Sequence, residues 1–438
     1  MNISVIGTGY VGLVTGAGLA DKGYNVICYD IVRDKINDIE RGVSPIYEKG
    51  LERIIKRNIG KRLTTTLDLK FAIMNSKITF ICVGTPSNKD GSINLRYIKD
   101  ACREIGNILK EKKEYHLIVV KSTVVPGTTE DVIIPELENA SGKKAHRDFG
   151  VVMSPEFLRE GVAVEDFLNP DRVIIGANDK GAGDLLADIY SEFNCPILRV
   201  NIKTAEMIKY ASNAFLATKI SYINEIGNIC KNLGIDVYDV AKGMSLDHRI
   251  SKYFLNAGLG FGGSCLPKDL RALIHKSKGM GYEPLLLESV MKVNEYQPKR
   301  ILEIAKNKIG SFKGKNVAIL GAAFKAETDD IRESPAIYII DSLLGEDAII
   351  TLYDPKANNN MKRIYKERIR YAETAKEALK NADLALIITD WKEFELLDFS
   401  DMRERIVIDG RRIIKRKIKK IKDRGKEEED IEYEGLCW

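Results

Sequence analysis

The sequence predicts an α/β protein in which two doubly wound domains are joined by a central helical domain with a long helix. Short runs of β-branched residues alternate with amphipathic helical patterns through roughly the first 200 residues. Helical spacing alone dominates the next stretch, and the alternation returns near residue 312. At 438 residues the chain is also too long for a single core. We therefore expect three domains, at residues 1–200, 201–311 and 312–438.

In the first domain, we expect strands that form a parallel sheet with helices on both faces. Their sequences are NISVIG, NVICYD, ITFICVG, LIVVKST, FGVVMSPE and RVIIGA. In the central domain, residues 204–234 carry apolar residues at three- and four-residue spacing and no proline, which predicts one long helix ending at Gly234. Further helices are expected at 266–279 and 285–309.

The third domain repeats the rhythm of the first. NVAILG, AIITLYDP, ADLALIITDW and RIVIDGR predict strands of a second doubly wound sheet. Residues 411–430 hold the strongest basic run of the chain. Because their isoleucines fall on one helical face, they predict a solvated amphipathic helix rather than an arm that binds nucleic acid.

The composition limits which ligands and which cellular compartment we expect for the protein. Lys and Arg number 68 against 63 acidic residues, and this net charge of +5 suits an anionic ligand but gives no general case for nucleic acid. Seven widely spaced cysteines and four histidines lack the spacings of disulfide frameworks or metal sites, so we expect no metal and a reducing cytoplasm. Each histidine is expected to be a surface or capping residue. We also expect no signal peptide and no membrane span, because no apolar run approaches about 18 residues.

The stretch ISVIGTGYVGLVTG places Gly7, Gly9 and Gly12 in a G-x-G-x-x-G pattern directly after the first strand. In a Rossmann-like fold these glycines allow a tight turn and the close approach of a pyrophosphate to the N-terminus of the next helix. Asp30 closes the second strand, where a carboxylate can bind the ribose hydroxyls and repel a 2′-phosphate. The pattern therefore favours NAD over NADP, although Asp30 could instead only cap the following helix.

A second glycine-rich stretch, GLGFGGSCLPKD, reaches Cys265 just before an expected helix. Its thiol could be a nucleophile or a small buried hydrophobe. Lys209 and Asn213 are four residues apart on an otherwise apolar helix face, where they would be costly to bury without partners. Glu156 and Glu160 have the same spacing, which on a helical turn would put both carboxylates on one face.

Together with Asp269, these residues suit a four-electron oxidation of an alcohol to an acid. A thiolate can add to an aldehyde to give a thiohemiacetal, loss of a second hydride gives a thioester, and water then releases the acid. A nearby ammonium would stabilise the oxyanion, and a carboxylate could position or deprotonate the water. A plain alcohol dehydrogenation needs no such thiol.

Several long motifs resemble, in the same order, those of the UDP-glucose/GDP-mannose dehydrogenase family over essentially the whole chain. They are GTGYVGLVTG, FICVGTPS, KSTVVPGTT, SPEFLREG, NPDRVIIG, EMIKYASNAFLATKISYINEIGN, LDHRI, FLNAGLGFGGSCLPKD, FKAETDDIRESPA and DGRR. The resemblance implies an enzyme that uses two NAD to oxidise UDP-glucose to UDP-glucuronate. It also implies that the third domain binds the UDP-sugar and not a second NAD.

The resemblance further implies catalytic roles. Cys265 would be the nucleophile and Lys209 the oxyanion stabiliser, and Asp269 would work with Lys209 in proton transfer and water handling. Thr123 resembles a water-positioning threonine, and Glu156 resembles a carboxylate used in proton transfer or thioester hydrolysis. Asn213 would join this catalytic group and hold the sugar nucleotide.

Binding residues follow from the same resemblance. NAD contacts are implied for Gly7, Gly9, Tyr10, Val11, Gly12, Asp30, Lys35, Val83, Gly84, Thr85, Pro86, Ser87, Ser122, Thr123, Glu160 and Arg332. Substrate contacts are implied for Glu156, Phe157, Leu158, Glu160, Lys209, Asn213, Arg249, Asn256, Gly258, Gly260, Phe261, Gly262, Phe324, Lys325 and Arg411. Arg249 resembles a residue supplied by the neighbouring subunit, which implies a homodimer or a larger homo-oligomer.

The identity of the sugar nucleotide rests on small differences. Leu266 after the cysteine is a form associated with GDP-mannose enzymes, whereas NPDRVIIG and NAFLATKIS resemble the UDP-glucose branch. We favour UDP-glucose, with GDP-mannose or another nucleotide-hexose as the alternative. Two other hypotheses stay open: a two-electron dehydrogenase in which Cys265 is structural, and a nucleotide-sensing regulatory protein without turnover.

Overall fold

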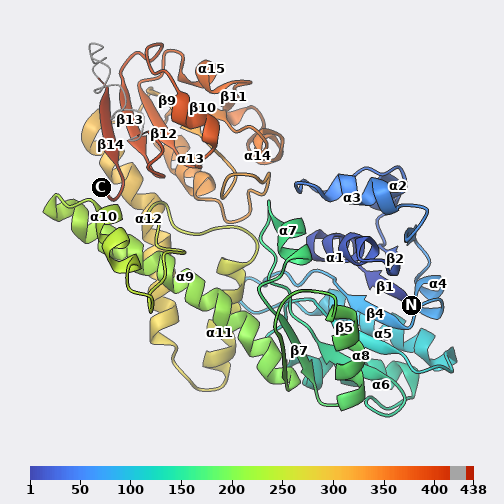
Figure 1. Ribbon diagram of the computed structural model, residues 1–438. Coiled ribbons are helices and arrows are strands. Elements are labelled where there is room, and N and C mark those ends of the chain that lie inside the picture. The colour runs from blue at the N-terminus through green and yellow to red at the C-terminus, as the bar shows by residue number, and fades with distance from the viewer. Residues whose placement is uncertain (415–430) are drawn as a thin grey trace. The chain divides into compact units, whose positions relative to one another are not determined.

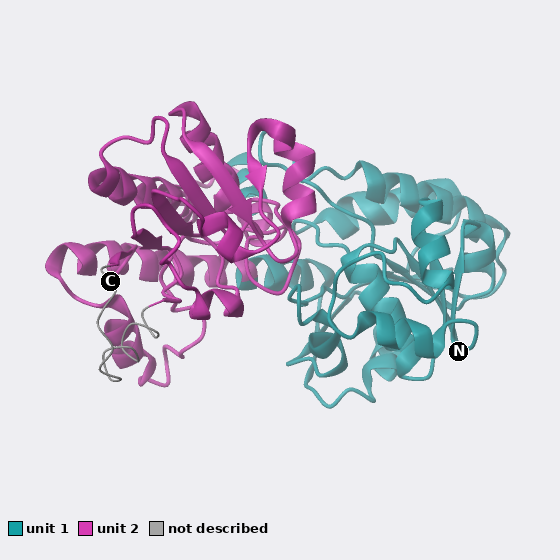
Figure 2. Cartoon of the chain, turned by 90° about the horizontal axis from the view of Figure 1, so that it is seen from above, with its two compact units in different colours: residues 1–212, 271–279 teal, residues 213–270, 280–438 magenta. Residues whose placement is uncertain are grey.

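The computed structural model describes residues 1–414 and 431–438, and the chain divides into two compact units (Figures 1 and 2). The first unit comprises Met1–Ser212 and Arg271–Gly279, and the second comprises Asn213–Leu270 and Met280–Trp438. The amphipathic helix expected at 411–430 lies almost wholly outside the described residues. The expected three-domain boundaries remain a prediction, because the two units divide the chain at other positions.

The first unit is built on an eight-stranded sheet in the order β3-β2-β1-β4-β5-β6-β7-β8. Its strands are β1 (Asn2–Ile6), β2 (Asn25–Tyr29), β3 (Leu63–Thr66), β4 (Ile78–Ile81), β5 (Leu117–Val120), β6 (Gly150–Met153), β7 (Val173–Ala177) and β8 (Ile197–Val200). The direction of strand order reverses between β1 and β4, and open α/β sheets bind ligands at such a reversal, beyond the carboxyl ends of the strands.

The expectation of a wholly parallel sheet is wrong at one pair, because β6 and β7 run antiparallel. Their connection contains only the six-residue helix α7 (Ala163–Leu168), which packs against α1 (Tyr10–Asp21) instead of crossing the sheet as a parallel connection requires. The remaining neighbouring pairs of this sheet are parallel.

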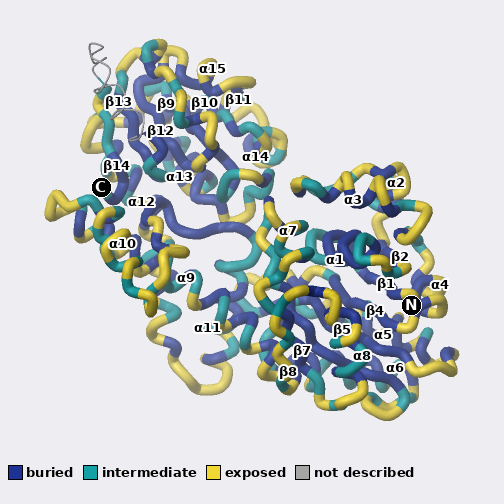
Figure 3. The backbone as a smooth tube through the Cα atoms, in the orientation of Figure 1, coloured by how far each residue is buried: buried dark blue, intermediate teal, exposed yellow. Residues whose placement is uncertain are grey.

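Helices cover both faces of this sheet, so its central strands are buried on both sides (Figure 3). In β5, Leu117 and Val119 belong to a buried cluster with residues of α1, α3 (Leu51–Asn58) and α8 (Lys180–Tyr190). Ile118 and Val120 belong to a second cluster with residues of α5 (Arg96–Glu111) and α6 (Ile134–Ser141). This two-sided burial explains why the strand reads as an uninterrupted apolar run. The helices of the unit are α1 (Tyr10–Asp21), α2 (Arg33–Glu40), α3 (Leu51–Asn58), α4 (Leu69–Met74), α5 (Arg96–Glu111), a π-helical turn (Thr129–Ile133), α6 (Ile134–Ser141), α7 (Ala163–Leu168) and α8 (Lys180–Tyr190).

The middle of the chain is helical, as expected. Its helices are α9 (Ile202–Leu233), α10 (Val237–Ser245), α11 (Leu266–Gly279) and α12 (Leu285–Ile309). The 32-residue helix α9 confirms the predicted long helix. Both α9 and α11 contribute residues to each of the two units (Figure 2).

The second unit contains a six-stranded, wholly parallel sheet in the order β11-β10-β9-β12-β13-β14. Its elements are β9 (Asn316–Leu320), α13 (Pro335–Gly345), β10 (Ile349–Tyr353), α14 (Asn358–Tyr365), a 3₁₀ turn (Lys366–Arg368), β11 (Arg370–Tyr371), α15 (Ala375–Leu379), β12 (Leu384–Ile387), a 3₁₀ turn (Lys392–Leu396), β13 (Ile406–Asp409) and β14 (Glu432–Gly435). Its strand order reverses between β9 and β12. The predicted fold class, two doubly wound α/β lobes with a helical middle, is therefore confirmed.

One histidine departs from the expectation that all four lie at the surface or cap helices. His116 precedes β5 and is fully buried, with its Nε2 2.7 Å from Thr79 Oγ1. Thr79 Oγ1 lies in turn 2.7 Å from Ser4 Oγ. Burial, together with the nearby charge of Lys112, lowers the pKa of His116 to about 3. The ring is therefore neutral in the folded protein near pH 7.

No helix within residues 1–414 and 431–438 has both the length and the apolar character that crossing a bilayer requires.

Candidate active site

The turn between β1 and α1 leaves room for an anion. Gly7 has a φ of +93°, and a Cβ atom on Gly12 would lie 1.8 Å from the Gly7 carbonyl oxygen, so only glycine lets the helix begin this close to the strand. In the described part of the chain, no side chain caps the N-terminus of α1 and no acidic residue stands in its first turn. Its N–H groups and the positive end of its dipole can therefore face a pyrophosphate.

Asp30 braces this turn from the end of β2. Its Oδ2 accepts hydrogen bonds from the backbone N–H and the hydroxyl of Thr8, both at 2.7 Å, and its Oδ1 accepts the N–H of Val32 at 3.0 Å. Burial alone would raise the pKa of Asp30, but these hydrogen bonds and the charge of Lys35, 3.7 Å away, lower the pKa overall. The N-cap residue of α2 is Val32, so Asp30 is not the cap of that helix.

The loops after β4 and β5 are hydrogen-bonded to each other at the carboxyl edge of the sheet. Thr85 Oγ1 donates to the carbonyl oxygen of Thr123 at 2.8 Å, and Ser122 Oγ donates to the carbonyl oxygen of Val83 at 2.7 Å. The structure thus brings together residues of the two segments, Val83–Ser87 and Ser122–Thr123, that the sequence predicts near the nicotinamide.

Glu156 and Lys209 form a buried ion pair in the first unit. Glu156 Oε1 lies 2.8 Å from Lys209 Nζ, and the two residues are 5% and 3% exposed. Burial alone would raise the pKa of Glu156, but the Lys209 charge and hydrogen bond lower it overall. The lysine Nζ also lies 5.4 Å from the centre of the Phe157 ring.

Glu156 and Glu160 do not lie on a helical turn. These residues belong to an irregular segment after β6, in which the Leu158 N–H donates to Glu156 Oε2 at 2.7 Å. That bond folds the chain back on the carboxylate, so spacing along the sequence does not place Glu160 on the same face. Glu160 itself is partly buried.

Two buried carboxylates that were not selected from the sequence support the loops around this edge of the sheet. Glu206, one turn before Lys209 on α9, accepts the N–H groups of Gly127 at 2.6 Å and Thr129 at 2.8 Å. Burial raises the pKa of Glu206. A polar residue at a buried position of a mainly apolar helix was the only signal available. This carboxylate ties the loop after β5 to the helix that carries Lys209.

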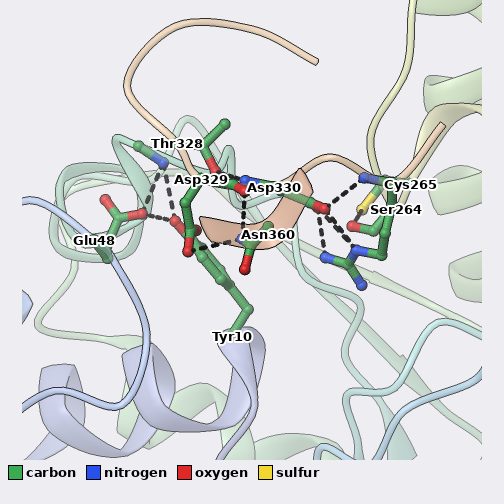
Figure 4. A network of polar contacts seen from close by, with 10 residues as sticks. Tyr10, Glu48, Ser264, Cys265, Thr328, Asp329, Asp330 and Asn360 are labelled. Carbon is green, nitrogen blue, oxygen red and sulfur yellow. Dashed lines mark hydrogen bonds and ion pairs between the residues drawn. The ribbon is translucent and has the colours of Figure 1, made fainter. Parts of the chain in front are cut away.

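Glu48 is the second buried carboxylate, and Figure 4 shows it beside Tyr10. The Tyr10 hydroxyl donates to Glu48, and the Glu48 carboxylate accepts the N–H groups of Gly161 at 2.8 Å and Ala163 at 2.9 Å. Glu48 therefore joins the glycine-rich turn to the segment after Glu160. The surrounding stretch SPIYEKG has no periodic pattern that could have identified it.

In the second unit, Cys265 stands at the N-terminus of α11 (Figure 4). Its carbonyl oxygen accepts the N–H of Asp269 at 2.9 Å, and its Sγ lies 3.5 Å from Ser264 Oγ. Cys265 is partly exposed, whereas five of the seven cysteines are buried. The positive end of the α11 dipole favours negative charge at this position.

Asp269 is held by two donors inside the second unit. Its Oδ2 accepts Asn213 Nδ2 at 2.6 Å, and its Oδ1 lies 2.6 Å from Lys268 Nζ. Asp269 is 1% exposed, and Asn213 is 8% exposed. Lys209 and Asn213 are one turn apart on the continuous helix α9, as their spacing predicts.

The predicted substrate residues Phe324 and Arg411 lie where the second sheet reverses. Phe324 follows β9, and Arg411 follows β13, where its Nε donates to the carbonyl oxygen of Ile388 at 2.8 Å. Asp409 fixes the Arg411 backbone by accepting its N–H at 2.7 Å. Lys325 Nζ lies 5.7 Å from the centre of the Phe324 ring.

Three residues that were predicted to contact ligands are exposed or paired with a neighbouring side chain. Arg249 has a side chain that is 77% exposed and pairs with Asp247 at 2.5 Å. Asn256 is exposed. Arg332, predicted to contact the cofactor, belongs to the second unit and pairs with Asp330 at 2.6 Å, whereas the glycine-rich turn belongs to the first. Their predicted contacts remain predictions.

The described residues do not form a set of metal ligands. Within residues 1–414 and 431–438, no group of three or more His, Cys, Asp or Glu side chains could hold a metal ion. A doubly wound lobe with a glycine-rich turn open to an anion, and with an aspartate at the end of the second strand, is typical of dinucleotide-dependent oxidoreductases.

Comparison with known proteins identifies the family. Three models of the UDP-glucose/GDP-mannose dehydrogenase family match consecutive parts of the chain: the NAD binding domain at residues 1–194, the central domain at 203–296 and the UDP binding domain at 318–416. The chain is 46% identical to the UDP-glucose 6-dehydrogenase AglM of Haloferax volcanii, over 100% of both chains. It is 40% identical to a GDP-mannose 6-dehydrogenase of Pseudomonas savastanoi, again over 100% of both.

A solved structure agrees. The UDP-glucose dehydrogenase of the hyperthermophilic archaeon Pyrobaculum islandicum matches with a TM-score of 0.93 and 40% identity, over 100% of this chain and 98% of that one. The chain belongs to the UDP-glucose/GDP-mannose dehydrogenase family, as the sequence motifs predicted. It is an NAD-dependent oxidoreductase with nucleotide-sugar dehydrogenase activity.

Proposed function

We propose that the protein oxidises the C6 hydroxymethyl group of UDP-glucose to the carboxylate of UDP-glucuronate, with two NAD reduced per sugar. The observation that carries the four-electron chemistry is the position of Cys265. The thiol is partly exposed at the N-terminus of α11, one turn before a buried aspartate that is held by Asn213 and Lys268. A purely structural cysteine does not need this setting.

The preference for UDP-glucose over GDP-mannose is supported by the relatives. The UDP-glucose 6-dehydrogenase of Haloferax volcanii is more similar in sequence, at 46% identity, than the Pseudomonas savastanoi GDP-mannose enzyme, at 40%. Leu266 argues in the other direction, so GDP-mannose remains the alternative substrate. The ratio of kcat/KM for the two sugar nucleotides decides between them.

The glycine-rich turn suits NAD. We assign the pyrophosphate to the N–H groups at the start of α1, near Gly9, and the adenosine ribose to Asp30, where a 2′-phosphate would meet a buried negative charge. Bound NAD supplies the acceptor for a hydride in each of the two oxidations. The protein's own residues carry out the remaining steps.

Oxidation of the C6 alcohol removes a hydride and a proton and leaves an aldehyde. The Cys265 thiolate then adds to the aldehyde carbon, so a C–S bond forms and the carbonyl oxygen becomes the oxyanion of a thiohemiacetal. We assign stabilisation of this oxyanion to the ammonium group of Lys209, whose pairing with Glu156 keeps it charged in a buried position. Loss of a second hydride converts the thiohemiacetal to a thioester.

Hydrolysis completes the reaction. Water attacks the thioester carbon, the C–S bond breaks, and the sulfur leaves as the thiolate. We assign the proton of the attacking water to a carboxylate, Asp269 or Glu156, and the positioning of that water to Thr123. The buried hydrogen bonds of both carboxylates fix their orientation before substrate binds.

Assembly and compartment are part of the proposal. We infer a homodimer or larger homo-oligomer in which the exposed Arg249 reaches the neighbouring subunit's site, with residues 201–311 as the central and dimerising domain. Residues 1–200 would bind NAD and residues 312–438 the UDP-sugar. Seven free cysteines fit a reducing cytoplasm.

Replacing the nucleophile tests the proposal. In Cys265→Ser we expect steady formation of the acid to fall by at least about 1,000-fold, because a serine alkoxide does not replace the thiolate. The affinities for NAD and UDP, measured by calorimetry, should stay within about threefold. Cys195→Ser is the matched control, because Cys195 is the other cysteine that is not fully buried. Undiminished turnover in Cys265→Ser would exclude a thioester mechanism.

A further inference from the structure

The loop that leads to Cys265 is held in place by amide side chains. Residues 255–263 are almost all buried but form no helix or strand. The N–H of Gly258 donates to Asn224 Oδ1 at 2.7 Å, and the carbonyl oxygen of Gly258 accepts Gln297 Nε2 at 2.7 Å. Both backbone groups of one glycine are therefore satisfied by side chains from α9 and α12.

The backbone of Phe261 is also hydrogen-bonded on both sides by a side-chain amide. The N–H of Phe261 donates to Asn294 Oδ1 at 2.7 Å, and the carbonyl oxygen of Phe261 accepts Asn294 Nδ2 at 3.0 Å. Gly260, between the two gripped residues, has a φ of +85°, and a Cβ atom there would lie 2.3 Å from Asn294 Oδ1. The glycine thus lets the asparagine approach the backbone closely enough to hold both of its polar groups.

The amides also order one another. Asn228 Nδ2 donates to Gln297 Oε1 at 2.8 Å, which leaves the Gln297 Nε2 pointing to the loop. Asn224 and Asn228 are four residues apart on α9, and Asn294 and Gln297 are three apart on α12, so each pair occupies one helix face. Asn224 and Gln297 are both fully buried. Gln297 has partners for both its oxygen and its nitrogen and is therefore fixed in one orientation, whereas Asn224 uses only its oxygen and its buried Nδ2 has no hydrogen-bond partner among the described residues.

We propose that Asn224, Asn228, Asn294 and Gln297, which we call the amide clamp, are positioning residues for the reaction. The clamp fixes the backbone at Gly258 and Phe261 and thereby sets the path of the chain into Cys265, four residues beyond Phe261. A glycine-rich loop has many accessible conformations, and without the clamp its buried backbone groups would lose their partners. The clamp therefore preorganises both the sugar-nucleotide loop and the thiol. This inference rests on the proposed role of that loop and of Cys265.

The variants Asn294→Ala and Gln297→Ala test the clamp. We expect the KM for UDP-glucose to rise at least tenfold and kcat to fall by a similar factor, with the KM for NAD changed less than twofold. We also expect the rate at which iodoacetamide alkylates Cys265, followed on the isolated peptide by mass spectrometry, to change at least threefold. This rate reports the position of the thiol without requiring turnover.

Asn358→Ala is the matched control within the same unit. The Asn358 amide also forms two hydrogen bonds with the backbone: it accepts the N–H of Asp354 at 2.9 Å and donates to the carbonyl oxygen of Ala372 at 2.9 Å. Its loss removes an equal number of hydrogen bonds away from the glycine-rich loop. If it shifts the sugar KM and the alkylation rate as much as Asn294→Ala does, the effect is one of general stability and the clamp is excluded.

Gln297→Glu gives a readout that a merely structural role would not move. At neutral pH its carboxylate faces the Gly258 carbonyl oxygen without a proton to donate, so we expect activity to fall as in Gln297→Ala. On acidification, the protonated carboxyl can donate again, and the kcat/KM of the variant relative to the unmodified protein should rise. A ratio that is flat with pH would contradict the proposal.

The outcomes separate the clamp from the proposed reaction. If the unmodified protein does not oxidise UDP-glucose, but Asn294→Ala and Gln297→Ala still change the Cys265 alkylation rate and Asn358→Ala does not, the clamp stands and the substrate assignment is wrong. If UDP-glucose is oxidised, and the two clamp variants keep the sugar KM, kcat and alkylation rate within twofold, the clamp is overturned and the reaction stands.

Discussion

At the scale of single residues, three buried carboxylates hold loops in place by accepting backbone N–H groups. Asp30, Glu48 and Glu206 each accept two or more hydrogen bonds from backbone N–H groups of a loop near the predicted cofactor or substrate contacts. A carboxylate that is already held in this way keeps its position when a ligand arrives. Asp30 combines this bracing role with the predicted ribose contact.

Asp30→Ala should change the choice of cofactor. Without the carboxylate, the ribose loses its acceptor and a 2′-phosphate no longer meets a negative charge. We expect the Kd for NAD to rise at least about tenfold and the preference for NAD over NADP to fall by at least the same factor. Calorimetric titration with each dinucleotide measures both quantities.

Thr8→Val separates ribose binding from bracing of the turn. This variant removes the hydroxyl that donates to Asp30 at 2.7 Å but leaves the carboxylate in place. The NAD/NADP preference should then move less than about threefold. An unchanged preference in Asp30→Ala, or an equal change in Thr8→Val, would show that the ribose assignment is wrong.

Sequence spacing predicted residues that lie on one face of a single regular helix. Lys209 and Asn213 were found because a helix repeats every three to four residues. Glu156 was singled out by its four-residue spacing from Glu160, but the two residues do not share a helical turn because the Leu158 N–H folds the chain back onto the Glu156 carboxylate. Glu48 and the Asn294 amide bind backbone far away in sequence, and no local pattern records such partners.

At the scale of elements, the amino-terminal ends of β4 and β5 share a buried polar cluster. His116, Thr79 and Ser4 form a hydrogen-bonded chain in which each residue is fully buried. Lys112 Nζ donates to the carbonyl oxygen of Ile73 at 2.6 Å nearby. Because a neutral imidazole is required in this dry setting, the first sheet should be sensitive to acid.

The free energy of unfolding should fall on acidification through His116. Its folded pKa, about 3, lies below the ordinary value of 6.5, so the unfolded state binds a proton that the folded state does not between these values. The stabilising contribution is therefore complete above pH 6.5 and is lost as the pH falls toward 3. The slope from this residue should approach about 1.4 kcal/mol per pH unit.

The comparison of His116→Gln with the unmodified protein measures this slope. Glutamine keeps a polar contact to Thr79 but does not titrate, so the difference in unfolding free energy should shrink steadily between pH 6.5 and pH 4. His248→Gln, at a side chain that is 94% exposed, is the control and should leave the slope unchanged. Parallel stability curves for His116→Gln and the unmodified protein would contradict the buried neutral state.

Elements with strong periodicity were predictable, and short edge elements were not. Strands such as β5, with four fully buried residues, and the 32-residue α9 were expected from their apolar patterns. The edge strands β3 and β8 were not, because LTTT and ILRV are short and only partly buried. The strand β7 was expected from RVIIGA, but its antiparallel direction was not, since strand direction depends on how α7 connects it and not on its own residues.

At the scale of the whole molecule, the two α/β lobes share one feature of sheet topology. Each sheet reverses its strand order once, and each places predicted ligand contacts at the carboxyl edge beside that reversal. In the first unit these are the glycine-rich turn and the loops after β4 and β5. In the second they are Phe324 and Arg411. Two such edges suit two nucleotide ligands, NAD and the UDP group of the substrate.

The proposed thioester at Cys265 requires both oxidations to take place on the same sugar, and the number of NADH formed per UDP-glucose measures whether they do. With UDP-glucose limiting and NAD in excess, the nicotinamide absorbance at completion gives this number. Our account predicts two NADH per sugar, with UDP-glucuronate as the product. One NADH per sugar would mean that oxidation stops at the aldehyde and would contradict the role of Cys265, and none would exclude UDP-glucose as the substrate.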